Sequence, residues 1–468
     1  MVFFVAFRGV GYTIIHCSLV PSRDRFVEWT TEKEESTVRI ARLNLSVAIC
    51  ITALLLFAAD AVHADLFTWA GGSGNWTDGN WGKGASYPGD GDTVAIGSGT
   101  VLLGSPSANL GSFEMTGGVL VFSNWNTKLS ATTVTIGGSS GTRITLPAAF
   151  TNELEKNRVW IECTDFTRNA GAIIDANEKG WAQGIQYIPG WGPGGGGKDY
   201  AGGGYGGRGT SSGGDGSWTG NADAMGGLPY GSLTEPLDPG SGGGAENAVG
   251  AVGGHGGGAV FIDATGEVTV HGTIRANGTG SVSLGGGSGG GVCIKCHTFK
   301  GTDGAVTANG SNASNGGGGG GRIAVTYNTG AQQSVSPKPR VVFSVAKGTT
   351  GGNGNNDMGT LYFSDTAILD ETWLPHTGRV SWAGSSWSVS SLSVSNGWIR
   401  IEPDGLQLTV ANTITIASTL GRLEVGVGGE DRGPVLLGAC PQRRAKSQDS
   451  GHQAYGLLPG PEAQVGGH

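Results

Sequence analysis

Short alternating apolar segments follow runs of glycine in the middle of the chain. Between residues 253 and 327 a glycine run leads three times into such a segment, at 260–262, 292–294 and 323–325. The sequence Ile-Arg-Ala-Asn at 274–277 returns as Val-Thr-Ala-Asn at 306–309, 32 residues later. A near-fixed period of this length is typical of a solenoid in which each repeat forms one coil. The pattern predicts an all-β fold, a parallel β-helix-like solenoid with long glycine-rich loops.

An earlier strand matches the repeated one position for position. Residues 159–163 align with 292–296, and residues 260–264 form the coil between them. Because side chains alternate along a strand, the match predicts which of them face the core. Inward positions are Val159, Ile161, Cys163, Val260, Ile262, Ala264, Val292, Ile294 and Cys296; outward positions are Trp160, Glu162, Phe261, Asp263, Cys293 and Lys295. Cys163 and Cys296 would then lie roughly 9 to 10 Å apart, too far for a disulfide.

Two strand-rich units flank these coils. Residues 65–146 form a tryptophan-rich opening unit, and residues 381–440 repeat part of it 279 residues later. Between them we place the glycine-rich coils at 147–330, with a long loop at 181–252, and a strand-rich connector at 331–380. We therefore expect strands and loops, with almost no helix, from residue 65 to about residue 440.

Two resemblances follow from these residues. The stretch Pro-Gly-Asp-Gly-Asp at 88–92, continued by Gly-Gly-Val-Leu-Val-Phe at 117–122, resembles the extracellular eight-glycine domain of some hyaluronan-related and ciliary proteins. The paired tryptophans at 69–81 and the glycine-run coils are similar to bacterial autotransporter-like β-helix proteins. The resemblance implies a secreted parallel β-helix, and neither match is a catalytic signature.

The two ends of the chain differ from the repeats. Residues 1–64 read as an upstream extension plus a signal peptide or signal anchor, because an apolar run at 47–59 precedes the small residues Val-His-Ala at 62–64. We expect a secreted or cell-surface protein that meets a membrane only through this segment. Residues 441–468 lose the periodicity and are interpreted as a disordered or artefactual tail.

Composition narrows the function classes. Of 468 residues, 91 are glycine and 14% are charged, with a net charge of −8, so nucleic acid is not an expected partner. Six cysteines are too few for a disulfide framework. We expect no cofactor and no metal. Cys293-x-x-Cys-His matches a haem attachment pattern, but the strand register places the two cysteines on opposite faces and makes Cys296 a small buried side chain. Asp90 and Asp92 suit an Asp-Gly turn or a calcium site, and the turn is favoured.

The loop at 181–252 carries the candidate contact residues. It is rich in glycine and contains aromatic residues, and two interpretations stay open: a flexible linker, or a binding loop whose rings stack on sugars. The candidates are Trp181, Trp191, Tyr200, Tyr205 and Trp218.

We expect a non-catalytic, adhesin-like scaffold that binds polysaccharide or extracellular matrix. The alternative is a polysaccharide hydrolase or lyase on a β-helix, for which Glu162 and Asp263 are the outward carboxylates.

Overall fold

The computed structural model describes residues 64–211, 222–279, 283–350, 354–402, 407–416, 421–425 and 435–438. The chain divides into two compact units, residues 1–60 and 61–468, and the described residues all belong to the second unit. The predicted signal segment before residue 64 and the predicted tail at 441–468 lie outside the described residues.

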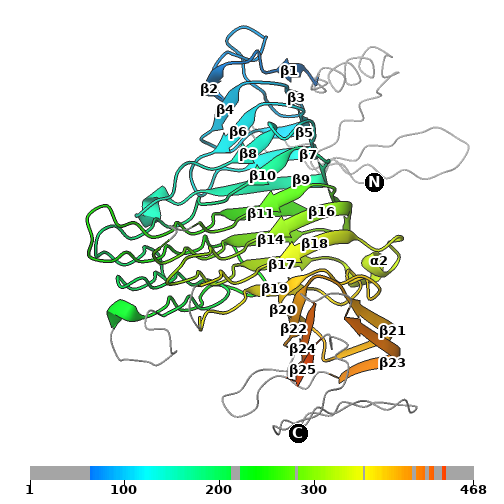
Figure 1. The fold of residues 1–468 in the computed structure, drawn as a ribbon. Coiled ribbons are helices and arrows are strands. Elements are labelled where there is room, and N and C mark those ends of the chain that lie inside the picture. Colours follow the sequence, from blue (N-terminus) through cyan, green and yellow to red (C-terminus); the bar gives the residue numbers. More distant parts are fainter. Residues whose placement is uncertain are drawn as a thin grey trace, which may run out of the picture. The chain divides into compact units, whose positions relative to one another are not determined.

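The described chain is a β-solenoid built from parallel ladders, as the sequence predicts (Figure 1). The first ladder contains, in order of pairing, β1 (Leu66–Thr68), β3 (Thr93–Ile96), β5 (Asn109–Met115), β7 (Leu129–Ile136), β9 (Arg158–Arg168), β12 (Glu267–Val270) and β15 (Thr298–Lys300). The second contains β2 (Ser73–Asn75), β4 (Thr100–Leu103), β6 (Val119–Phe122), β8 (Arg143–Thr145), β10 (Ile173–Asp175), β13 (Thr273–Arg275), β16 (Thr302–Thr307) and β18 (Arg340–Ser344).

A third ladder starts at the first half of β9. It continues through β11 (Ala259–Ala264), β14 (Gly291–Lys295), β17 (Arg322–Thr326), β19 (Thr360–Phe363), β20 (Thr377–Trp382), β22 (Trp398–Ile401) and β24 (Arg422–Val425), and β25 (Val435–Gly438) pairs with β24 in antiparallel fashion. A separate pair is formed by β21 (Ser386–Val394) and β23 (Gln407–Ile416). Helix within the described ranges is confined to α2 (Thr329–Gln333) and the 3-10 turns η1 (Glu153–Glu155) and η2 (Ala222–Ala224).

The core is a set of stacked columns of apolar side chains. In the third ladder, Ile161, Ile262, Ile294, Val325 and Phe363 stand in register on successive strands, and each is fully buried. The second ladder stacks Val101, Leu120, Ile144, Ile174, Ile274, Val306 and Phe343 in the same way. Because each coil buries its apolar face only against its neighbours, these columns hold the coils together.

The repeated asparagine of the sequence forms a hydrogen-bonded column at one corner. The side-chain oxygen of Asn177 accepts the backbone N–H of Asn277 at 2.8 Å, and that of Asn277 accepts the N–H of Asn309 at 2.7 Å. Asn309 in turn accepts the N–H of Ala346 at 2.8 Å. Each side chain thus satisfies a backbone donor of the next coil, which explains why the Ala-Asn sequence recurs with the coil period.

The inward positions agree with the prediction. The aligned side chains from Val159 to Ile294 are buried, and Cys296 is partly buried. The three cysteines of the described chain, Cys163, Cys293 and Cys296, are free, as expected from the coil that separates the first from the last.

Two outward positions, Phe261 and Cys293, are nevertheless buried. A segment of the long loop, residues 230–238, crosses this face of the third ladder: Arg322 donates to the Tyr230 carbonyl at 2.8 Å, and Lys295 pairs with Glu235. The alternation predicted that these two side chains point away from the core, but it did not predict that residues 230–238 cover them.

Strand pairing near the start of the described solenoid recurs near its end. At the start, Trp69 and Trp76 each meet Trp81 edge-on at 4.9 Å, and the three rings are buried. The partial repeat is visible in the pairing, because β21 with β23 and β22 with β24 repeat β5 with β7 and β6 with β8. A one-residue irregularity after Val389 distinguishes the second copy from the first.

Candidate binding surfaces

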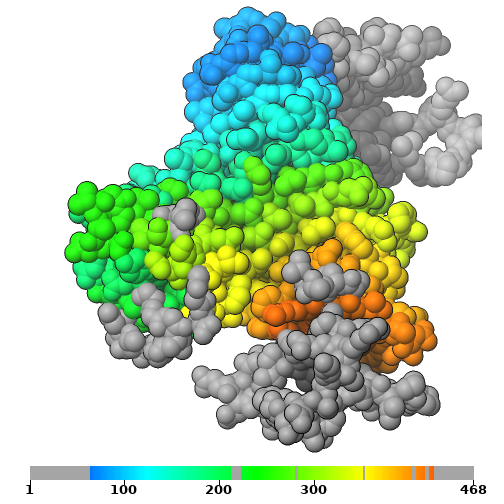
Figure 2. Space-filling view, viewed as in Figure 1, coloured from blue at the N-terminus to red at the C-terminus, as the bar shows by residue number. Residues whose placement is uncertain are grey.

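The glycine runs form an ordered layer beside the strands. We call the segments at residues 189–211, 226–245, 253–258, 285–291 and 316–321 the glycine layer. In Figure 2 they belong to the continuous block coloured from green to yellow, which also contains strands β11, β14 and β17.

Hydrogen bonds within the glycine layer follow a period of three residues. Residues 285, 286 and 287 donate in turn to Gly244, Gly316 and Thr279. The next three residues, 288 to 290, donate to Ser241, Gly319 and Ala276, which belong to the same three neighbouring segments. Three residues per turn is the period of the extended polyproline II helix. The layer is therefore a bundle of such extended helices, each bonded to several neighbours.

At many glycine positions of the layer this packing leaves no room for a side chain. A Cβ placed on Gly287, Gly289 or Gly290 would collide with a backbone carbonyl of an adjacent segment. Glycine is therefore required here for close approach of backbones on all sides. The described parts of the predicted loop at 181–252 are thus an ordered extension of the solenoid and not a flexible linker.

The predicted contact residues separate into three groups. Trp181 and Tyr205 are buried: the first packs on Phe150 with ring centres 4.7 Å apart, and the second packs on Tyr230, also at 4.7 Å. These two rings anchor the glycine layer and present no face to solvent. Trp191 is exposed and Tyr200 is partly exposed. Trp218 lies outside the described residues.

An exposed apolar strip surrounds Trp191. We call residues 185–191 the rim segment. Its members Ile185, Tyr187, Ile188 and Trp191 are 51%, 42%, 45% and 43% exposed. Four large apolar side chains exposed within seven residues are unusual for a soluble surface, where such residues are normally scattered. Sequence reasoning selected Trp191 and omitted Tyr187 and the two isoleucines, although all four stand in one short stretch.

The backbone of the rim segment is fixed to the glycine layer. Gln186 donates to the Ala251 carbonyl and Tyr187 donates to the Glu246 carbonyl, both at 2.9 Å, while Trp191 accepts from Gly242 at 2.9 Å. Gln186 and Tyr187 have φ values of 39° and 63°, so a left-handed turn presents these side chains. The strip is therefore held in place before any ligand arrives.

Polar groups border the same strip. The Tyr200 hydroxyl donates to the Glu246 carboxylate, and this hydrogen bond raises the pKa of the phenol. Lys198 lies 4.0 Å from the centre of the Tyr187 ring and pairs with Asp223 at 2.9 Å. The hydrogen bond to Asp223 raises the pKa of Lys198. An apolar strip with hydroxyl, carboxylate and ammonium groups at its edge suits a ligand with both apolar faces and hydroxyl groups.

The other candidate groups have structural partners. Asp92 accepts the backbone N–H of Asp65 at 2.9 Å and that of Gly89 at 2.8 Å, so it caps the predicted turn. Asp90 accepts the N–H of Asn109, at the start of β5, at 2.8 Å. No group of three or more His, Cys, Asp or Glu side chains suited to a metal ion occurs in the described ranges. Burial raises the pKa of the Cys293 and Cys296 thiols to about 12, as expected of packed side chains.

The two carboxylates of the hydrolase hypothesis stand side by side. Glu162 on β9 is in register with Asp263 on β11, which is in register with Lys295 on β14. Glu162 pairs with Lys128 at 2.8 Å. The row therefore places two neighbouring carboxylates beside one ammonium on this face of the ladder. A hydrolase or lyase activity stays a prediction.

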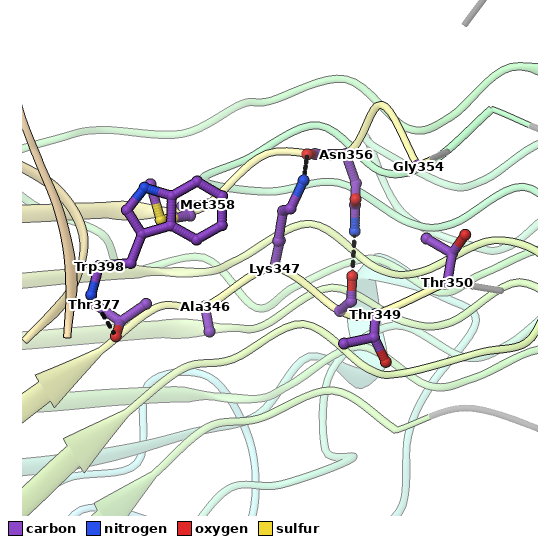
Figure 3. A pocket seen from close by; sticks show the side chains of 10 residues that line it. Ala346, Lys347, Thr349, Thr350, Gly354, Asn356, Met358, Thr377 and Trp398 are labelled. Carbon is purple, nitrogen blue, oxygen red and sulfur yellow. Dashed lines mark hydrogen bonds between the residues drawn. The ribbon is translucent and has the colours of Figure 1, made fainter. Parts of the chain in front are cut away.

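A cavity of about 380 Å³ lies where the connector meets the second tryptophan-rich unit (Figure 3). It is lined by Ala346, Lys347, Gly348, Thr349, Thr350, Gly354, Asn356, Met358, Thr377 and Trp398. The Lys347 ammonium donates to the Asn356 carbonyl at 3.0 Å, and the Trp398 indole N–H donates to Glu424 at 2.8 Å.

Comparison with protein family models, with curated proteins and with solved structures yielded no match for this chain. None of the helices in the described part is long and apolar enough to cross a membrane. Function must therefore be inferred from the side chains and surfaces of this chain alone.

Proposed function

We propose that the protein is a secreted or cell-surface, non-catalytic scaffold, adhesin-like, that binds polysaccharide or extracellular matrix through the rim segment. One observation supports this most directly: Tyr187 and Trp191 are exposed on a backbone that hydrogen bonds hold to a rigid layer. An aromatic ring that is already fixed loses little conformational entropy when a sugar ring stacks on it.

The solenoid supports the scaffold role. Its interior is filled by apolar columns, and the rings of the rim segment, Tyr187 and Trp191, are exposed. Contacts of this kind are individually weak, so useful adhesion would come from several of them acting together on a polymeric ligand.

The test replaces the two exposed rings and leaves the layer intact. A double variant Tyr187→Ala with Trp191→Ala should lose roughly tenfold or more in retention on immobilised polysaccharide or matrix, since each stacked ring contributes about 0.5 to 1.5 kcal/mol. Its melting temperature should stay near that of the unmodified protein.

Leu154→Ala is the matched control, because Leu154 is a highly exposed apolar residue outside the rim segment. Equal loss of retention in this control, or full retention in the double variant, would contradict the assignment. Release of shortened glycans from the support would favour the hydrolase or lyase instead.

A further inference from the structure

The cavity beside Trp398 has a composition that the scaffold role does not require. Of its ten lining residues, Lys347 alone carries a formal charge, and no carboxylate lines the cavity. Its volume of about 380 Å³ falls in the range of small-molecule sites, roughly 300 to 1,000 Å³. A cavity with one cation and no acid favours a ligand with one negative charge.

The cation has unused donor capacity. An ammonium group has three N–H donors, and among the described residues Lys347 donates one hydrogen bond, to the Asn356 carbonyl. Its ammonium also lies 5.7 Å from the centre of the Trp398 ring. Burial lowers the pKa of Lys347, with Arg400 and Arg422 adding to the effect and Asp357 and Glu424 opposing it. A carboxylate entering the cavity would offset that desolvation.

An acceptor in the cavity wall lacks a partner. Asn356 is 2% exposed, and its side-chain nitrogen donates to the carbonyls of Gly348 and Gly318 at 2.7 and 3.2 Å. Those two bonds fix the orientation of the amide, and its buried oxygen has no hydrogen-bond partner. A buried acceptor without a donor is destabilising, so a ligand hydroxyl that donates to it would bind favourably.

The remaining wall is amphipathic. Trp398 is held by its hydrogen bond to Glu424, and the Arg422 guanidinium lies 4.7 Å from its ring centre. Met358 and the hydroxyl-bearing residues Thr349 and Thr377 also line the cavity (Figure 3). An apolar ring face with hydroxyl groups near it matches the two-sided surface of a pyranose.

From the Lys347 cation, the orphaned Asn356 oxygen and the Trp398 ring together we infer that this cavity binds a carboxylated sugar residue, a uronic acid. The carboxylate would pair with the Lys347 ammonium, a hydroxyl would donate to Asn356, and an apolar sugar face would lie toward Trp398. The site is separate from the rim segment and does not depend on it.

The experiment compares acidic and neutral sugars on the full chain. Titration calorimetry and saturation-transfer NMR with oligomers of glucuronate and galacturonate should show binding at least tenfold tighter than with glucose and galactose oligomers of equal length. Acetate tests whether a carboxylate alone is enough, and the monomeric uronates test whether one sugar residue suffices. Equal affinity for acidic and neutral oligomers, binding of acetate as tight as that of the uronates, or no binding to either oligomer series would overturn the inference.

Variants then assign the site. Lys347→Gln should reduce uronate affinity at least tenfold and leave any binding of neutral sugars unchanged. Lys338→Gln is the matched control, because Lys338 is paired with Glu371 in a different surface hollow. If Lys347→Gln retains uronate binding, the site lies elsewhere. The Tyr187→Ala with Trp191→Ala variant should bind uronates normally, which distinguishes failure of this site from failure of the rim segment. Should Lys347→Gln unfold, the wild-type comparison of acidic with neutral oligomers still decides the ligand class.

Discussion

Arg168 and His376 are among the ionisable residues buried in the solenoid. Arg168 is 1% exposed, and two of its nitrogens, Nε and Nη1, have no partner; burial lowers its pKa to about 10. His376 is 3% exposed, and its Nδ1 accepts the backbone N–H of Phe343 at 3.2 Å, which requires a neutral ring. Neither residue stood out in the sequence, because each occupies a single position without a repeat.

His376 predicts a dependence of stability on pH. Burial lowers its pKa to about 4, and nearby Asp370 only partly opposes this. Because the unfolded chain, with a histidine pKa of about 6.5, binds the proton more readily, stability is full above about pH 6.5 and falls as the pH drops toward 4. The loss reaches about 3 kcal/mol at pH 4.

Urea unfolding at pH 7, 5 and 4 measures this effect. Other groups, including His255, titrate in both proteins, so the difference between wild type and His376→Gln isolates the one histidine. The variant should show a shallower decline, and parallel curves for the two proteins would mean that His376 is not responsible.

At the scale of elements, the strands were predictable and the glycine layer was not. Alternation and the match between residues 159–163 and 292–296 predicted the register of β9, β11 and β14, and the recurring Ala-Asn sequence predicted the coil period. The layer leaves no such pattern, because its three-residue period lies in backbone hydrogen bonds and more than half of its positions are glycine, which has no side chain. The sequence therefore did not show which aromatic residues of the loop are buried and which are exposed. Trp181 and Tyr205 are buried and anchor the layer, whereas Tyr187 is exposed in the rim segment.

The layer predicts a sharp difference between two glycine substitutions. Gly289→Ala would force a Cβ against the Ala308 carbonyl, whereas a Cβ at Gly104 meets nothing within 4 Å. We expect Gly289→Ala to lower the free energy of unfolding by about 3 kcal/mol or more and Gly104→Ala to change it by less than about 0.5 kcal/mol. Thermal and urea unfolding of both variants measure this, and similar stability of the pair would show that the layer can expand.

At the scale of the whole molecule, loop and coils form one folded body. Residues 230–238 cover Cys293 on the third ladder. The reactivity of the Cys293 thiol therefore reports whether this segment is packed on the ladder. Fold class and coil order followed from the sequence, but this long-range cover did not. Its contacts, from Arg322 to a backbone carbonyl and from Lys295 to Glu235, join residues far apart in the chain and do not recur with the coil period.

The cover makes Cys293 unreactive in the folded protein. With the other five cysteines replaced by alanine, Cys293 should react with a thiol reagent at pH 8 roughly a thousandfold more slowly than in denaturant, since its pKa is raised from 9 to about 12 and the thiolate is the reactive form. Replacing residues 232–237 by a glycine-serine linker should restore much of the reactivity while the β circular dichroism persists. If Cys293 stays unreactive after this replacement, a different segment protects it.

The period of three in the glycine layer also governs how the chain can change length. A residue inserted into the run at 285–290 rotates every later donor by a third of a turn, so each would point to a different neighbouring segment. An insertion of three restores the phase and only lengthens the helix. Among relatives of this chain, the glycine runs should therefore differ in length by multiples of three, a rule that acts on amino acids much as the reading frame acts on nucleotides.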